Sequence, residues 1–148
     1  MAKIATGLRI SSDELVTSQR ENMSRQEIFI WNELDTTDQK KSGAFFSKLM
    51  GWTLKEVDAG EFGIYTIFQK DGQDVAGMMN PTPESPANQS RWQTYIAVND
   101  VDKCAKQTAE LGGKVLVPPH EVPDFGRVCL ISDPTGATVP LVAPVQKK

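Results

Sequence analysis

The sequence predicts an α+β fold in which two βαβββ units form an eight-stranded curved sheet around a cleft. The first observation is an internal repeat, because Asp38 and Gly51 recur as Asp100 and Gly113 at an offset of 62 residues. A repeat of this length is a whole supersecondary unit rather than a solenoid module. Further matches are Lys41 with Lys103, Leu49 with Leu111, Leu54 with Leu116, Phe62-Gly63 with Phe125-Gly126, and Gly72 with Gly136.

The second observation is the order of predicted elements in the first copy. Residues 27–34 are rich in Ile, Phe and Trp, which favours a strand. Thr37-Asp38 is a plausible helix start, and Gly51 a helix stop after a helix that buries Phe45, Phe46 and Leu49. Asp71-Gly72 is a strong hairpin turn signal. Three further strands are therefore expected at residues 52–57, 63–69 and 74–79.

The second copy repeats this order. Residues 92–98 are predicted to be a strand, Asn99 or Asp100 a helix cap, and Gly112-Gly113 the helix end. Asp133-Pro134-Thr135-Gly136 is the second hairpin turn. Strands are expected at residues 114–117, 127–132 and 137–142.

The chain divides into four segments on this pattern. We expect an N-terminal extension over 1–25, a first unit over 26–80, a Pro-rich linker over 81–91 and a second unit over 92–145.

Composition restricts the partners. A formal net charge of −3 and the lack of a basic stripe argue against nucleic acid. No apolar run approaches the roughly 20 residues that span a membrane, and no signal-peptide segment is recognisable, so a cytoplasmic location is expected. Cys104 and Cys129 are expected to be reduced thiols. A small-molecule ligand and a homodimer are the predicted partners.

Strand alternation predicts which side chains face the cleft, because successive side chains point to opposite faces. On the first strands, Ile28, Ile30 and Leu34 are expected beneath the helix. The last strands are aligned at an offset of 64 residues, which pairs Ala76 with Pro140 and Met78 with Val142. The predicted ligand-binding residues are Phe29, Trp31, Glu33, Met78, Gln93, Tyr95 and Pro140.

Glu33 is the predicted acid/base residue. A carboxylate among aromatic side chains is costly to desolvate unless it is paired or lines a wet cleft. Two roles stay open: a salt bridge or exposed rim, or a ligand-contacting carboxylate that transfers a proton.

Several segments resemble the glyoxalase/bleomycin-resistance/dihydroxybiphenyl-dioxygenase group, the vicinal oxygen chelate superfamily. They are Trp31-Asn32-Glu33-Leu34, Phe45-Phe46 with Gly51-Trp52, Tyr95 through Asp100, and Phe125-Gly126-Arg127 followed by Asp133-Pro134-Thr135-Gly136-Ala137. The resemblance covers roughly residues 26–144. It implies eight strands around a cleft and, in the metal-dependent members, a divalent ion held by His, Gln or Glu on the first and last strands of both units.

The sequence departs from that ligand pattern. The corresponding positions are Trp31, Ala76, Gln93 and Pro140, of which only Gln93 offers a metal-binding atom. A shift of register adds Glu33 at most, and His120 lies in a predicted loop. The sequence therefore predicts no cofactor and argues against glyoxalase I activity, with an atypical metal site kept as an alternative.

Three functions remain open from the sequence. The first is a metal-free protein that binds a small organic molecule between the repeats. The second is a lyase, isomerase or dioxygenase-type enzyme of the same superfamily, with Glu33 as acid or base and Tyr95 as hydrogen-bond donor. The third is a scaffold whose partner surface is the N-terminal extension.

Overall fold

The computed structural model describes residues 26–81 and 89–145, and its elements follow the predicted order. The predicted extension and most of the predicted linker lie outside these residues, so the division into segments stays a prediction. The first half holds β1 (Ile28–Asp35), α2 (Gln39–Met50), β2 (Thr53–Asp58), the short 3-10 helix η1 (Gly60–Phe62), β3 (Ile64–Lys70) and β4 (Gln73–Met79). The second half holds β5 (Arg91–Ala97), α3 (Val101–Glu110), β6 (Lys114–Val122), β7 (Gly126–Ser132) and β8 (Thr138–Pro144).

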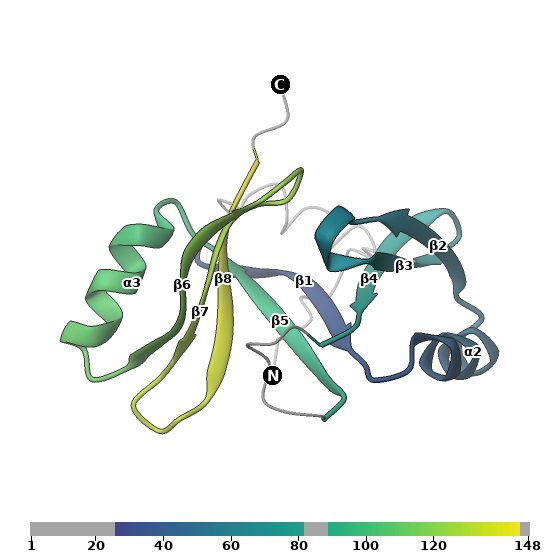
Figure 1. Ribbon diagram of the computed structural model, residues 1–148, viewed down its shortest axis with the longest axis horizontal. Helices are drawn as coiled ribbons and strands as arrows, with labels where there is room; N and C mark the ends of the chain where they lie inside the picture. Colours follow the sequence, from purple (N-terminus) through teal and green to yellow (C-terminus); the bar gives the residue numbers. More distant parts are fainter. Residues whose placement is uncertain (1–25, 82–88, 146–148) are drawn as a thin grey trace, which may run out of the picture.

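All eight strands belong to one sheet, in the order β2-β3-β4-β1-β5-β8-β7-β6. Strands β1 and β5 pair antiparallel at its centre, while β1 pairs parallel with β4 and β5 pairs parallel with β8. The two halves therefore have the same strand order, counted outward from the β1–β5 pair, which we call the seam. Figure 1 shows the resulting curved sheet, with β1 and β5 crossing between the two halves. The predicted fold class is confirmed.

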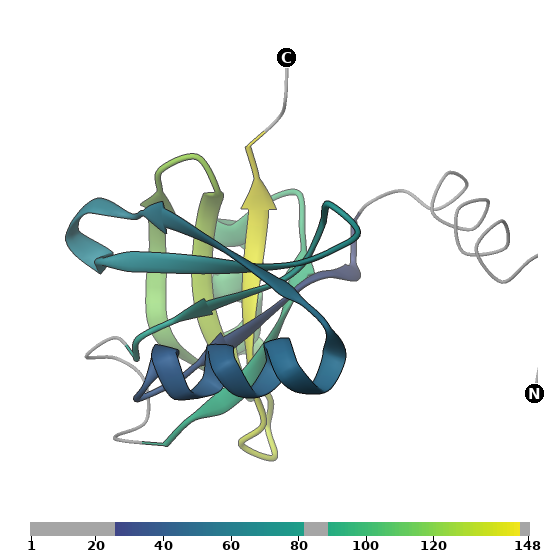
Figure 2. The same cartoon turned by 90° about the vertical axis from the view of Figure 1, so that its right-hand side faces the viewer.

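Both helices lie on the same side of this sheet, which we call the outer face; the opposite side is the inner face. Figure 1 shows α2 and α3 at opposite ends of the molecule, outside the curve of the strands. In Figure 2, which looks at the first half from outside, α2 crosses in front of the sheet. The curvature thus leaves the inner face, at the seam of the repeats, uncovered by α2 and α3.

The repeat is visible in the helix caps. The Asp38 carboxylate accepts from the backbone N–H of Lys41, and that of Asp100 accepts from Lys103, both at 3.0 Å. Each aspartate satisfies an N–H group that has no partner within its helix. Gly51 ends α2 in the left-handed conformation, with φ of 69°. The 62-residue offset therefore holds at the two N-caps, whereas α3 ends earlier than predicted, with Leu111 as its C-cap.

Each half has its own hydrophobic core on the outer face. Leu34, Phe68, Ala76 and Met78 form the first, and Phe46 and Trp52 pack against it. The second consists of Val98, Val101, Ala105, Cys129 and Leu141. Polar side chains lie at the seam, where β1 and β5 pair, between the two cores.

Helix α2 meets the sheet differently from the prediction. Phe45 and Leu49 were expected to be buried, but 57% and 59% of their surfaces are exposed. The buried residue of α2 is Gly43, where an added Cβ would lie 3.0 Å from Cδ1 of Leu54. The helix approaches the sheet through this glycine and Phe46, which turns Phe45 and Leu49 outward.

His120 lies in a strand rather than in the predicted loop. It belongs to β6 and pairs with Val128 of β7, and its Nδ1 lies 2.9 Å from the carbonyl oxygen of Pro118. Prolines are tolerated here because β6 is the edge of the sheet, where one side of the strand has no partner.

Neither described helix has the length and apolar character needed to cross a membrane.

Candidate functional site

A buried carboxyl group lies at the seam of the two repeats. Glu33 is on β1, and 4% of its surface is exposed. Tyr65 from β3 donates a hydrogen bond to its Oε2, and Tyr95 from β5 donates to its Oε1, both at 2.9 Å. One tyrosine comes from each half, so the repeat brings both to a single acceptor.

A glycine and an indole hold Tyr65 in place. The indole N–H of Trp31 donates to the Tyr65 hydroxyl at 2.9 Å. Gly77 pairs with Glu33 across β1 and β4, and a Cβ at this position would lie 1.7 Å from the Tyr65 hydroxyl oxygen. The phenol therefore occupies the space that any side chain on residue 77 would need.

A second polar chain continues along the seam toward the end of β1. The Gln93 amide donates to the Asp35 carboxylate, and its oxygen accepts from Nη2 of Arg91 at 3.3 Å. Asp35 lies opposite Arg91, as Glu33 lies opposite Gln93, in the antiparallel register. Two successive inner-face positions on each strand thus carry polar groups: the carboxyl groups of Glu33 and Asp35 on β1, and the amide of Gln93 and the guanidinium of Arg91 on β5.

Burial changes the acidity of these groups. It raises the pKa of Glu33 from its usual 4.5 to about 7, more than the hydrogen bonds from Tyr65 and Tyr95 lower it. The nearby charge of Asp35 adds to the rise. The pKa of Asp35 is also raised by burial, against the bond from Gln93 and the charge of Arg91. Burial and the Glu33 charge raise the pKa of both tyrosines, so they remain hydrogen-bond donors.

Four of the predicted site residues meet in this arrangement: Trp31, Glu33, Gln93 and Tyr95. Pro140 is buried on β8 between the outer-core residue Leu141 and Val139, so alternation places it on the inner face.

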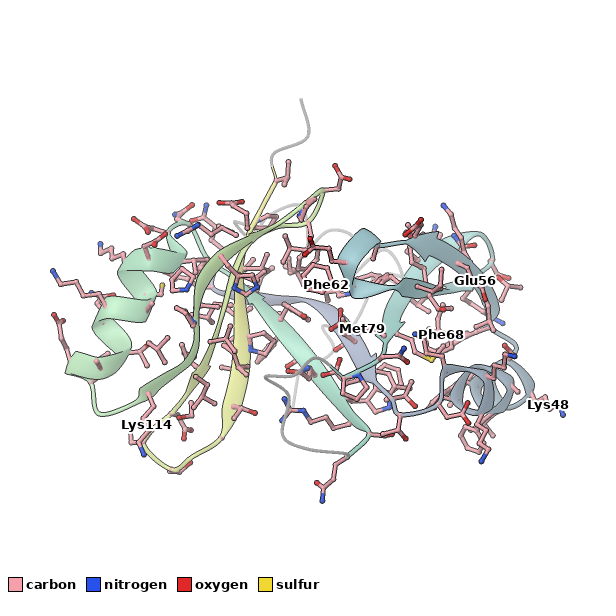
Figure 3. The ribbon with its side chains drawn as sticks, viewed as in Figure 1. Lys48, Glu56, Phe62, Phe68, Met79 and Lys114 are labelled. Atoms are coloured by element: carbon pink, nitrogen blue, oxygen red, sulfur yellow. The ribbon has the colours of Figure 1, made fainter. Side chains whose placement is uncertain are left out.

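The prediction for Met78 was wrong. Met78 and Ala76 belong to the first core on the outer face. The parallel pairs Leu34 with Met78 and Ile96 with Leu141 show that the last strands align at an offset of 63. The turn glycines had suggested 64. The inner-face positions of β4 are therefore Gly77 and Met79, and Figure 3 shows Met79 in the space between the halves.

The prediction for Phe29 was also wrong. The register shifts between Phe29 and Trp31, so the alternation breaks there. Phe29 lies opposite Ile96, which packs against the outer core, and 63% of its surface is exposed.

The sequence reasoning missed Asp35, Tyr65, Gly77 and Arg91. Asp35 and Arg91 continue the alternation of Glu33 and Gln93 by two residues, so extending the strands would have found them. No comparable signal in the sequence marked Tyr65, because the pairing of β3 with β4 decides which side chains of β3 point to the inner face.

The donor atoms at the seam do not fit a metal site. At the positions suggested by the family pattern, Trp31 donates to Tyr65 and Pro140 has no donor atom. The position predicted at Ala76 moves to Gly77 with the corrected offset of 63, and neither residue has a donor atom in its side chain. The remaining position, Gln93, holds its amide between Asp35 and Arg91. Within residues 26–81 and 89–145, no group of three His, Cys, Asp or Glu side chains is arranged to hold a metal ion.

Comparison with known sequences now identifies the family. The sequence model of the Glyoxalase/Bleomycin resistance protein/Dioxygenase superfamily matches residues 31–141. The chain belongs to this superfamily. The glyoxalase-superfamily match includes the whole polar seam, from Trp31 to Tyr95.

Two curated relatives are similar over most of the chain. A provisionally named glyoxylase, CFP32 of Mycobacterium bovis, is 37% identical over 113 residues, which are 75% of this chain and 43% of the relative. The anthracycline biosynthesis protein DauV of a Streptomyces species is 33% identical over 119 residues, covering 72% of this chain and 43% of the relative. The chain thus spans less than half the length of the curated relatives it matches.

Solved structures share the glyoxalase-superfamily fold at low sequence identity. Methylmalonyl-CoA epimerase from Mycobacterium tuberculosis has a TM-score of 0.59 at 15% identity, over 86% of this chain and 96% of the epimerase. The Streptomyces coelicolor epimerase in complex with 2-nitronate-propionyl-CoA has a TM-score of 0.57 at 17% identity, over 80% of this chain and 97% of the epimerase.

Proposed function

We propose that this glyoxalase-superfamily protein binds a small organic molecule on its inner face, at the Glu33 cluster, without a metal held by the protein. The observation that carries the proposal is the convergence of Tyr65 and Tyr95, one from each repeat, on a single buried carboxyl group. A buried polar cluster at a seam between two cores is costly to assemble for stability alone.

The chemistry of the inner face suits a flat or carbonyl-bearing molecule. Trp31, Tyr65 and Tyr95 supply aromatic surface beside a few convergent polar groups, which is the usual composition of a ligand site. Phe125 stands edge-on to Tyr95, with ring centroids 5.4 Å apart, and extends this surface into the second half. The names of the relatives, a glyoxylase and an anthracycline biosynthesis protein, are compatible with small organic ligands.

A thermal-shift screen of small aromatic and carbonyl compounds tests the proposal. A compound that binds only the folded protein at 100 times its Kd stabilises it by about 2.7 kcal/mol. Replacing Tyr95 with phenylalanine removes one donor from the site and should weaken binding of the hits about tenfold. The matched control is Trp52→Phe, which changes an aromatic residue on the outer face. Hits that bind all three proteins equally, or a screen without hits, would count against an inner-face site.

A second candidate function is acid/base catalysis, which the raised pKa of Glu33 favours. A carboxyl group with a pKa of about 7 is suited to accept and return a proton near neutral pH. As a carboxylate, Glu33 would take a proton from a carbon next to a carbonyl group. Its protonated form would then return the proton to the other face or to a neighbouring atom, as an isomerase requires. The Tyr95 hydroxyl, which donates to Glu33 in the free protein, would have to turn to the carbonyl oxygen of the substrate.

Deuterium exchange distinguishes catalysis from binding alone. Hits with a C–H bond next to a carbonyl group are incubated in D2O, and loss of that proton signal is followed by NMR. If Glu33 is the base, Glu33→Gln should slow exchange at least about 100-fold while the variant still binds. Exchange at the rate of protein-free buffer, with tight binding retained, would identify a binding protein instead.

We also propose that the protein forms a homodimer. Phe45, Leu49 and Met50 are exposed on neighbouring turns of α2, and exposed apolar groups of this kind favour association. The assembly role of the N-terminal extension concerns residues outside those described. Sedimentation of the full chain and of a variant lacking residues 1–25 tests both ideas.

A further inference from the structure

We infer that the ligand of the inner face is an organic cation, and that Glu33 and the aromatic rings around it recognise its positive charge. This inference rests on the proposed binding function and adds the chemical class of the ligand. It is carried by the charges of the seam and by the ring faces that border the Glu33 carboxyl group.

The seam carries more acidic than basic groups. Its two strands hold the carboxyl groups of Glu33 and Asp35 but a single cation, Arg91. The ion pairs within the described residues are formed by Lys41 and Arg127, so no basic side chain there lies within 4.0 Å of either seam carboxyl group. The charge of Arg91 acts on Asp35, whereas no cation of the described residues acts on Glu33. Glu33 is therefore the carboxyl group that lacks a positive partner.

The Glu33 carboxyl group is only partly compensated by its hydrogen bonds. An ionised carboxylate offers about four acceptor positions. The hydroxyl groups of Tyr65 and Tyr95 use one on each oxygen. Both donors are neutral, and burial raises the pKa of Glu33 in spite of them. A nearby cation would supply the compensation that the buried charge lacks.

Aromatic side chains from both halves border this carboxyl group. Trp31 and Tyr95 lie opposite each other on β1 and β5, and the Tyr65 ring reaches the same carboxyl group from β3. Phe125 stands edge-on to Tyr95. All four side chains are half-buried, so part of each remains accessible. The ring contacts of the described residues do not join Trp31, Tyr65 and Tyr95 to one another, so these three rings do not cover each other's faces.

Rings of this kind attract positive charge. The face of an aromatic ring is negative, and a cation within about 6 Å of the centroid of a Trp or Tyr ring is attracted to it. Groups of such rings are the usual binding sites of quaternary ammonium ions. The hydrogen bonds that Tyr65 and Tyr95 donate to Glu33 polarise the two phenols and make their rings more negative. A cation over these rings is close enough to the Glu33 carboxylate for the charges to attract, and neither tyrosine needs to leave it.

Binding of a cation should depend on the ionisation of Glu33. Near it, Asp35 and Arg91 are the other charged groups of the seam, and the inner-face residues of β4 carry no charge. Tyr65 and Tyr95 stay neutral, because burial raises the pKa of both. With a pKa of about 7, Glu33 is ionised in about a tenth of the molecules at pH 6 and in about nine tenths at pH 8. A cation that pairs with the ionised form should bind about tenfold more tightly at pH 8.

Matched cations and neutral molecules test this inference. Choline is compared with 3,3-dimethylbutan-1-ol, and N-methylpyridinium with toluene, by NMR-detected titration of the full-length protein at pH 6 and pH 8. The charge of both cations is fixed, so the pH acts on the protein alone. We expect at least one cation to bind about ten times more tightly than its neutral counterpart at pH 8. That preference should fall to about twofold or less at pH 6.

Glu33→Gln keeps the shape of the side chain but cannot ionise. In this variant the members of each pair should bind equally within about twofold at both pH values. Glu110→Gln removes an exposed carboxylate at the end of α3, on the outer face, and should keep the wild-type preference. The comparison of pH 6 with pH 8 uses the wild-type protein and stands even if Glu33→Gln does not fold.

The outcomes separate the inference from the proposed function. Equal binding of cations and neutral counterparts to the wild-type protein at pH 8 would leave a ligand site but overturn its preference for a cation. The same holds if compounds of the wider screen bind and neither cation does. A preference that is equal at pH 6 and pH 8, or that survives in folded Glu33→Gln, would overturn the role of Glu33. If neither the probes nor any compound of the wider screen binds the wild-type protein, the proposed binding function itself fails.

Discussion

Replacing Gly77 with alanine is expected to destabilise the fold by about 3 kcal/mol, although the change adds a single methyl group. The new Cβ would lie 1.7 Å from the Tyr65 hydroxyl oxygen and 2.3 Å from its Cζ. The ring must therefore move, and both Glu33 and the Trp31 indole lose a hydrogen-bond partner inside the protein. Urea denaturation of the two proteins measures the difference.

Gly43→Ala is the matched control. A Cβ at Gly43 would meet the end of the Leu54 side chain at 3.0 Å, and this flexible group can move. Alanine also favours the helix by about 1 kcal/mol over glycine. The two effects oppose each other, so we expect a net change within about 1 kcal/mol.

A double-mutant cycle shows whether the contact with Tyr65 causes the loss. In a Tyr65→Ala background the obstructing ring is absent, so adding Gly77→Ala should cost less than about 1 kcal/mol. Equal losses with and without the Tyr65 ring would contradict the packing described for the inner face.

The second large effect concerns pH. The free energy of unfolding should fall by about 3 kcal/mol as the pH rises from 4.5 to 8, because of Glu33 alone. The folded protein holds the Glu33 proton up to about pH 7, whereas the unfolded chain releases it near 4.5. Below pH 4.5 both states are protonated and the cost is absent. As the pH rises through about 7, the folded protein must bury the charge and the cost becomes complete.

Glu33→Gln isolates this contribution. The amide keeps the shape of the side chain but cannot ionise, so the variant should gain stability relative to wild type as the pH rises from 5 to 8. Urea denaturation at several pH values checks this result. Glu61→Gln removes an exposed carboxylate on η1 and serves as the control. Parallel stability curves for Glu33→Gln and wild type would show that Glu33 ionises as easily in the folded protein as in the unfolded chain.

Periodicity in the sequence was sufficient to predict the fold. Two Asp caps at one offset and two Gly-containing hairpin turns, with regular alternation around them, place every strand and both described helices. The faces of β1 and β5 followed from alternation as far as it was regular. The prediction failed where one extra residue enters the ladder, as between Phe29 and Trp31.

The candidate site depended on contacts that no local pattern encodes. The role of Gly77 arises because Tyr65, from another strand, fills the position of its missing side chain. Met78 was misplaced because the turn glycines of the two repeats are 64 residues apart, whereas the strands that follow them align at an offset of 63. Arg91 was assigned to the linker, although its pairing with Asp35 makes it the first residue of β5.

The central claim is that Glu33 is a proton-holding carboxyl group at the centre of a ligand-binding inner face. It is tested most directly by 13C NMR of the glutamate carboxyl carbons between pH 4 and 9, with and without the tightest-binding probe. The Glu33 signal is identified by its absence from the Glu33→Gln spectrum. The account predicts a midpoint of about 7 that moves when the probe binds. A midpoint near 4.5 that does not respond to a bound probe would contradict it.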